Sequence, residues 1–78
     1  MPLYCFHMVR PNDRIDDPFG TEFPDLETAA RHAVRIAREL EAEAFGPDWL
    51  IVVAEHDGPD LMEVTPDGEI RPLPPQQR

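Results

Sequence analysis

Seventy-eight residues are enough for one small domain, because a chain of this length buries only about 60% of the surface that it exposes when unfolded. Acidic residues outnumber basic residues by 16 to 7 and the formal net charge is −9, so we expect no nucleic-acid partner. The sequence contains neither lysine nor serine, which excludes a P-loop, a Schiff-base lysine and a serine nucleophile.

The sequence also indicates where the protein resides. Cys5 is the only cysteine, so no disulfide can form within the chain and nothing demands an oxidising compartment. The apolar run at residues 3–9 has neither a basic segment before it nor a small-residue cleavage site after it. No segment approaches the roughly 20 apolar residues of a membrane helix. We therefore expect a cytoplasmic protein with no membrane contact.

Residues 3–9 predict the first strand, because aromatic and β-favouring residues precede the turn formers at residues 10–13. Both alternating sets of side chains are apolar, which is typical of a central strand covered on both faces. Residues 20–23 predict a short returning strand, with the polar segment 12–18 as a long hairpin loop.

A helix of about 20 residues is predicted next. Asp25 can accept hydrogen bonds from the amides of the first turn, and Gly46-Pro47 ends the helix. Small apolar residues recur at offsets of three and four along one side, namely Leu26, Ala29, Ala30, Ala33, Ala37, Leu40 and Ala44. On the other side, Arg31, Arg35 and Arg38 lie among glutamates, and Glu27 is placed to pair with Arg31.

Residues 49–54 predict a second central strand, and residues 61–64 predict another. A tight turn at residues 65–69 leads into a possible short strand at 70–71. The fold class is therefore α+β: a single domain at residues 1–71, in the order β-β-α-β-β(-β), with one helix on a small, mostly antiparallel sheet. Residues 72–78 predict a proline-rich flexible tail.

One helix can cover only one face of this sheet, so the second face would be an exposed apolar patch. The candidate covers are the proline-rich tail of the same chain or a second copy, and we expect a homodimer in preference to a monomer capped by its own tail. The candidate interface residues are Leu3, Cys5, Val9, Leu50 and Val52.

Candidate residues for chemistry are few. Imidazole and carboxylate together suit Zn²⁺ or Mn²⁺, and His7, His56 and Asp57 are the candidate ligands. Their spacing matches no metal motif, so locally hydrogen-bonded histidines are favoured and we expect no metal and no other cofactor. Cys5 lies within a predicted central strand, where a thiol behaves as a small hydrophobe with a raised pKa.

Several motifs carry a family resemblance. Met1-Pro2 precedes the first strand, which contains Tyr4 and Phe6-His7. The helix start reads Gly20-Thr21-Glu22-Phe23-Pro24-Asp25-Leu26-Glu27, and Trp49, Ile51 and Val53 follow. The chain resembles a family of small uncharacterised bacterial proteins that share a domain of unknown function. That resemblance implies the fold and a cytoplasmic setting but no catalytic residue. Two departures stand out: Phe19 occupies a usually acidic position, and the sequence after Gly58 differs from the usual C-terminal strand.

The leading hypothesis is a noncatalytic, self-associating protein-interaction module, because no nucleophile–base pair is evident in the sequence. A partial likeness to HicB-type antitoxins, carried by Phe23-Pro24-Asp25-Leu26 before the helix, implies an alternative: a regulator that binds a small basic protein partner. The third hypothesis is a small metal-dependent hydrolase that uses His7, His56 and Asp57.

Overall fold

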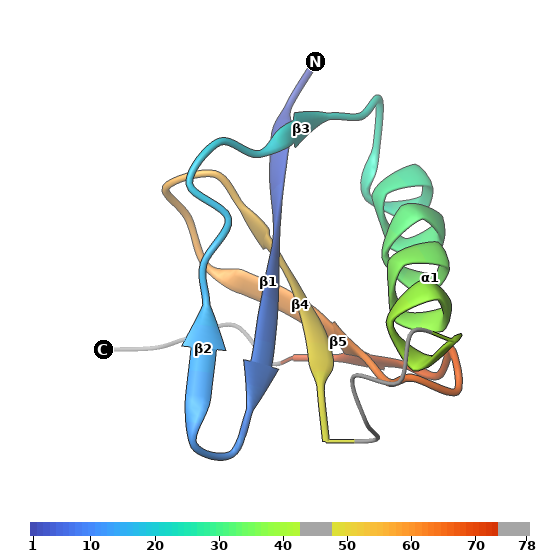
Figure 1. The fold of residues 1–78 in the computed structure, drawn as a ribbon. Coiled ribbons are helices and arrows are strands. Elements are labelled where there is room, and N and C mark those ends of the chain that lie inside the picture. Colours follow the sequence, from blue (N-terminus) through green and yellow to red (C-terminus); the bar gives the residue numbers. More distant parts are fainter. Residues whose placement is uncertain (43–47, 74–78) are drawn as a thin grey trace.

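One helix lies across one face of a six-stranded antiparallel sheet (Figure 1). The computed structural model describes residues 1–42 and 48–73. Its elements in chain order are β1 (Leu3–Arg10), β2 (Asp13–Ile15), β3 (Thr21–Glu22), α1 (Leu26–Ala42), β4 (Leu50–Glu55), β5 (Asp60–Val64) and β6 (Ile70–Pro72). The predicted α+β class, with one helix on an antiparallel sheet, is confirmed.

The strand order is β2-β1-β4-β5-β6, and β3 pairs with β1 on the same edge as β2. Since β3 and β4 are both antiparallel to β1, they run parallel to each other on its two sides. The helix makes the connection between β3 and β4, and it therefore has to cross a face of the sheet. The first strand and the Leu50–Glu55 strand are central neighbours, as predicted.

The helix begins where its capping residue predicts. The backbone N–H of Thr28 donates to Asp25 Oδ1 at 2.9 Å, so the side chain satisfies an amide of the first turn. On the exposed side, Arg31 Nη2 lies 3.1 Å from Glu27 Oε2, as the spacing of four residues predicts. The predicted helical position of Ala44 and the Gly46-Pro47 stop lie outside the described residues.

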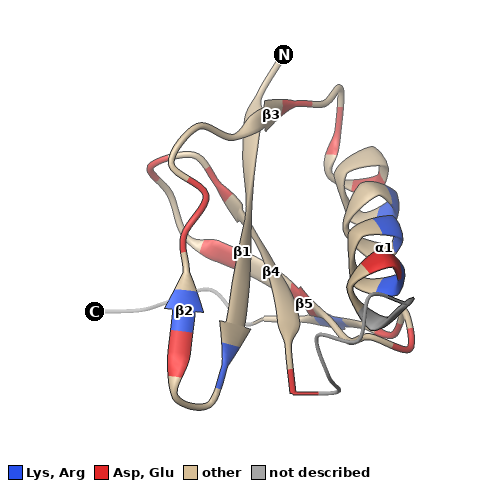
Figure 2. Cartoon of the chain, viewed as in Figure 1, with Lys and Arg blue, Asp and Glu red and all other residues tan. Residues whose placement is uncertain are grey.

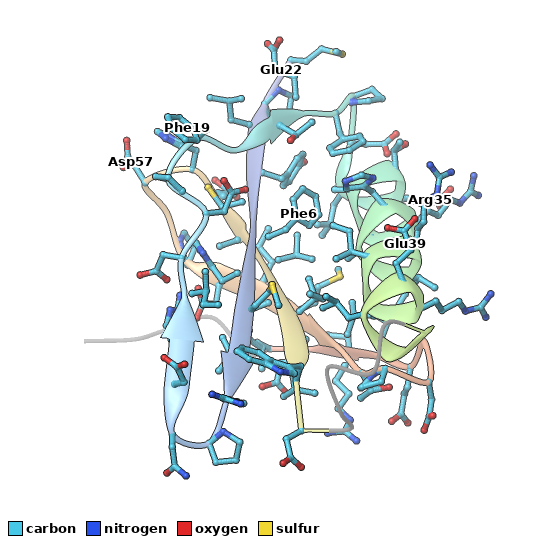
Figure 3. The ribbon with its side chains drawn as sticks, in the orientation of Figure 1. Phe6, Phe19, Glu22, Arg35, Glu39 and Asp57 are labelled. Atoms are coloured by element: carbon cyan, nitrogen blue, oxygen red, sulfur yellow. The ribbon has the colours of Figure 1, made fainter. Side chains whose placement is uncertain are left out.

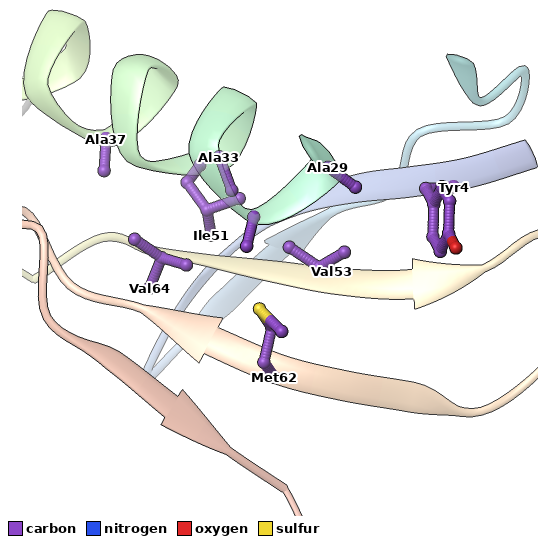
Figure 4. Close-up of a cluster of buried hydrophobic side chains, with 9 residues drawn as sticks. Tyr4, Ala29, Ala33, Ala37, Ile51, Val53, Met62 and Val64 are labelled. Atoms are coloured by element: carbon purple, nitrogen blue, oxygen red, sulfur yellow. The ribbon is translucent and has the colours of Figure 1, made fainter. Parts of the chain in front are cut away.

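The core lies between the helix and the middle of the sheet (Figure 4). Ala29, Ala33 and Ala37 are buried, and they face the strand side chains of the same cluster, which include Ile51, Val53, Met62 and Val64. Alanine brings little apolar area but lets the helix axis approach the sheet closely, so the branched residues of β4 and β5 supply most of the buried volume. The predicted alanine face is confirmed.

The connection after β1 differs from the prediction. Instead of a long loop, the pairs Arg10↔Asp13 and Met8↔Ile15 show a hairpin whose turn is formed by residues 11 and 12. The returning strand β2 is three residues long, and its residues, two charged and one apolar, are all exposed. Its sequence therefore lacks the apolar alternation that predicts a strand, and a short charged strand is a common way to protect a sheet edge.

The prediction that the second sheet face is uncovered is wrong at its centre. Cys5 and Val52 are each 4% exposed within the single chain, so neither presents its side chain to a second copy. Leu3 is 37% exposed, and Val9 and Leu50 are half-buried. Of the five candidate interface residues, only Leu3, Val9 and Leu50 therefore remain accessible.

Two segments of the same chain explain this burial. The loop at residues 16–20 crosses the second face, because a Cβ built on Gly20 would lie 3.4 Å from Cys5 Sγ. Arg14 of the edge strand β2 reaches Asp60 of β5, with 3.9 Å between Nη2 and Oδ1. That contact requires the sheet to curl toward this face, since two strands separate β2 from β5 in the sheet order.

The C-terminal strand extends slightly beyond the predicted end of the domain. Pro72 pairs with Met62 in β6, and the N–H of Leu73 donates to the carbonyl of Leu61 at 3.0 Å. The preceding turn is stabilised by the buried side chain of Thr65, whose Oγ1 accepts the N–H of Glu69. Residues 74–78 of the predicted tail lie outside the described residues.

Candidate functional site

The loop between β2 and β3 is anchored by the carboxylate of Asp17. One oxygen, Oδ2, accepts the N–H of Phe6 at 3.2 Å. The other, Oδ1, accepts the N–H of Phe19 and of Gly20, each at 3.1 Å. The bond to Phe6 fills the gap that β2 and β3 leave along the edge of β1. Asp17 therefore joins the loop to the sheet as an additional strand residue would.

The second anchor of this loop is His7. Its Nδ1 accepts the backbone N–H of Asp17 at 3.0 Å, and its side chain is 12% exposed. At the end of the loop, Gly20 has a φ of 74° and its Cα faces the carbonyl of Tyr4, which a Cβ would approach to 3.2 Å. Glycine is required there both for the backbone conformation and for the close approach.

The environment of Asp17 stabilises its charged form. Burial opposes ionisation of this carboxyl, but hydrogen bonds from the amides of Gly20, Phe6 and Phe19 outweigh it and lower its pKa. An ionised carboxylate is the stronger acceptor, so the loop is held most firmly when Asp17 is charged.

The anchored loop presents Phe19 to solvent, where its side chain is 81% exposed (Figure 3). Leu3, which pairs with Glu22 across β1 and β3, lies at the same end of the sheet. Asp57 lies in the β4–β5 turn next to His56, whose N–H donates to the carbonyl of Leu3 and whose ring lies close to Gly20, the residue after Phe19. We call Leu3, Phe19, Glu22 and Asp57 the Phe19 surface.

This end of the molecule is acidic (Figure 2). Residues 1–3, 16–22 and 55–58 include five acidic side chains, Asp16, Asp17, Glu22, Glu55 and Asp57, and neither lysine nor arginine. Within residues 1–42 and 48–73, the arginines lie on the helix, on β6 and on the β1–β2 hairpin. The exposed aromatic side chain therefore lies within a field of negative charge.

The structure does not bring the three candidate metal ligands together. Within residues 1–42 and 48–73, no three His, Cys, Asp or Glu side chains are placed to hold a metal ion. His7 points Nδ1 at the loop amide of Asp17, whereas His56 Nδ1 lies 3.3 Å from Asp57 Oδ2 in the β4–β5 turn. Local hydrogen bonding thus accounts for His7, as the sequence favours.

Cys5 and His56 lie close to each other, on either side of Gly20, since a Cβ there would meet Cys5 Sγ at 3.4 Å and His56 Cδ2 at 3.6 Å. A thiol beside an imidazole can serve as a nucleophile. Here, burial raises the pKa of Cys5, and the charges of Asp17 and Asp57 raise it further. The predicted burial of this thiol is confirmed.

Sequence reasoning did not identify Phe19 as a surface residue with a role. The available signal was an apolar aromatic residue inside an otherwise polar, acidic loop. Its exposure depends on Asp17, whose partner Phe6 is 11 residues away in the chain, and that contact is not visible in the local pattern.

The turn at residues 55–58 stores strain at Asp57, whose φ is 59°. The N–H of Gly58 donates to the carbonyl of Glu55 at 2.9 Å, which places Asp57 at the position where turns prefer glycine. We expect Asp57→Gly to raise the free energy of unfolding by about 0.5–1 kcal/mol. Glycine removes the strain of the left-handed conformation, and this gain is partly offset because glycine also increases the conformational entropy of the unfolded chain. Urea denaturation measures the change.

A matched control is Asp67→Gly, which removes the same charge from another turn, at a residue without a positive φ. This control is expected to destabilise the protein, because it adds chain entropy without relieving strain. Equal stabilisation by both variants would show that charge, and not backbone conformation, is responsible.

The fold defines the class of this protein: a small α+β domain in which one helix covers one face of a curled antiparallel sheet and a loop packs against Cys5 and His7 on the other. The chain belongs to the family described as Domain of unknown function (DUF6894), whose family model matches residues 3–65. The expected membership of an uncharacterised family is thereby confirmed, and β6 lies beyond the matched region. No curated protein and no solved structure matches the chain.

In the part of the chain that the structure describes, no helix combines the length and the apolar character needed to cross a membrane.

Proposed function

We propose that this domain is a noncatalytic protein-interaction module that binds other protein chains through the Phe19 surface. The observation that carries the proposal is the 81% exposure of Phe19 on a loop fixed by Asp17. Aromatic side chains are enriched at binding hot spots. A loop already ordered before binding also reduces the entropy that association costs.

The noncatalytic part of the proposal is supported by the chemistry of the nearest reactive groups. Cys5 is buried with a raised pKa, and His56 pairs with an exposed carboxylate instead of activating the thiol. A thiol held in its neutral form is a poor nucleophile.

Photo-crosslinking tests the binding surface. A benzophenone amino acid is placed at position 19 and, as a control, at the exposed helix position 35, and each protein is irradiated in its native cells. We expect a discrete covalent adduct with a protein from position 19 and none from position 35. Adducts of equal yield at both positions, or none at position 19, would contradict the proposal.

Binding through Phe19 also predicts a separation of stability from affinity. Phe19→Ser is expected to leave the urea midpoint unchanged, because the side chain is exposed, and to weaken binding of the crosslinked partner at least about tenfold, as for a hot-spot residue. Isothermal titration with the identified partner measures the affinity. A variant that binds as tightly as the wild type would remove Phe19 from the binding surface.

Self-association is a second candidate, and one observation favours it. Val9 and Leu50, which pair across β1 and β4, stay half-buried on the second face. Two copies that cover these residues would form a homodimer, which sedimentation equilibrium at tens of micromolar would detect. Leu50→Arg would abolish such a dimer, whereas a monomeric mass for the wild-type protein would eliminate this candidate.

The interaction module could also act as an antitoxin-like regulator that binds a small basic protein partner. It is favoured by the acidic charge around Phe19, since a small basic protein would be attracted to that end.

A further inference from the structure

We propose that the Phe19 surface binds a basic segment of another protein, in which arginine or lysine residues flank an apolar side chain. This inference rests on the proposed function and specifies the chemistry of its partner. Two independent properties of the surface carry it: an aromatic residue that stays exposed among the described residues, and surrounding side-chain charges that are predominantly negative.

The apolar part of the surface provides the anchor. Phe19 is 81% exposed and Leu3 is 37% exposed, whereas most other large apolar side chains of the described residues lie in or against the core. The backbone on both sides of Phe19 is fixed, because the N–H groups of Phe19 and Gly20 both donate to Asp17. An apolar partner side chain would bury this ring without having to order the loop.

The charge around the anchor selects the partner. Glu22 pairs directly with Leu3, and Asp57 contacts His56, whose ring lies close to Gly20, the residue after Phe19. The neighbouring segments carry acidic residues and neither lysine nor arginine (Figure 2). A basic segment would form charge pairs at the edge of the buried ring, which speeds association and favours this class of partner over others.

The same negative charges disfavour binding of nucleic acids, anionic membranes or a second copy of this chain at the Phe19 surface. Nucleic acids and anionic membranes would be repelled by this end, because binding them needs basic side chains. A twofold contact between two copies through this surface would place Glu22 and Asp57 of one copy near the same residues of the other. A basic protein segment meets both the apolar and the electrostatic requirement.

Fluorescence anisotropy with three labelled 12-residue peptides tests the proposal. The first alternates arginine with leucine and phenylalanine, the second keeps the arginines but replaces the apolar residues with glycine, and the third replaces arginine with glutamate. Each is titrated with the whole protein at low and at physiological salt. We expect binding of the first peptide only, with an affinity that decreases as salt increases.

Variants separate the two requirements. Phe19→Ser is expected to weaken binding of the first peptide at least about tenfold. The double variant Glu22→Gln with Asp57→Asn is expected to weaken it about fivefold and to reduce the salt dependence. The matched double variant Glu39→Gln with Asp67→Asn makes the same charge change at exposed positions outside this surface, and we expect less than about a twofold effect. Urea melts verify that all the variants fold.

The outcomes distinguish this inference from the proposed function. Equal weakening by both double variants, or equal binding of the glycine peptide, would show nonspecific attraction to a net charge of −9 and overturn the inference. A crosslink from position 19 to a protein, combined with no preference for the basic apolar peptide, would overturn the partner chemistry but leave the interaction module intact. A crosslink from position 19 to a second copy of this chain would overturn the inference of a basic partner and support self-association instead.

Discussion

Replacing Asp17 with alanine is expected to lower the free energy of unfolding by about 3 kcal/mol. Three backbone amides, those of Phe6, Phe19 and Gly20, donate to this carboxylate, and a hydrogen bond to a charged group contributes about 1.5–3 kcal/mol. The expected loss is smaller than the sum of three such contributions, because water can replace the carboxylate as acceptor for the exposed Phe19 amide. Urea denaturation followed by circular dichroism measures the change.

Asp16→Ala is the matched control, since the neighbouring side chain is exposed and contacts Arg14 and His7 without holding a backbone amide. We expect its urea midpoint to equal that of the wild type. A domain of under 80 residues has only about 3–5 kcal/mol of stability, so Asp17→Ala is expected to be partly unfolded in buffer, and Asp17→Asn provides a milder variant. Equal midpoints for the alanine variants of Asp16 and Asp17 would show that the loop is not anchored as the structure indicates.

The contribution of Asp17 should also depend on pH. Its folded pKa lies below the unfolded value of about 3.9. The stabilisation is therefore complete above about pH 5 and is lost as the pH falls through the folded pKa. Asparagine, like a protonated carboxyl, keeps one acceptor oxygen. We expect the stability difference between the wild type and Asp17→Asn to be large at pH 7 and to shrink toward pH 3.

The comparison with Asp17→Asn isolates this residue from other titrating carboxyls. A hydrogen bond from the side chain of Arg14 lowers the pKa of Asp16, and one from the Thr28 amide lowers the pKa of Asp25. These groups are present in both proteins, so their contributions cancel in the difference. A gap that stays constant from pH 7 to pH 3 would mean that ionisation of Asp17 does not stabilise the loop.

The second large effect is expected from Ala33→Leu, which should cost about 2–3 kcal/mol. Ala33 is fully buried and faces the sheet beside Ile51 (Figure 4). Extra methylene groups in a filled core force side chains and backbone to shift, at a cost of about 1–3 kcal/mol. The upper part of that range applies because the helix backbone would have to move away from β4.

Arg35→Leu is the control for Ala33→Leu, because it introduces the same residue into the same helix on the exposed side. Alanine, arginine and leucine have similar helix propensities, so this control should leave thermal stability nearly unchanged. If both variants lowered the melting temperature equally, exposed apolar surface or helix propensity, and not the close approach of helix and sheet, would be the cause.

The helix, its capping residue Asp25, its alanine face and the two central strands can be predicted from local sequence alone. These features follow from local composition and from the spacing of apolar residues, and residues within an element are close in the chain. The possible strand at residues 70–71 was identified for the same reason, since a turn with Pro66 and Gly68 precedes it.

The cover of the second sheet face and the exposure of Phe19 depend on contacts between segments that are far apart in the chain. The strand β2 lacks an apolar pattern, so its pairing is fixed by the hairpin turn and by β1 instead of by its own side chains. The loop after it closes over Cys5 because Asp17 replaces a missing strand residue beside Phe6. Such contacts join residues that are far apart in the chain, and they leave no periodic pattern in the sequence. The burial of Cys5 and the exposure of Phe19 are therefore visible only in the folded protein.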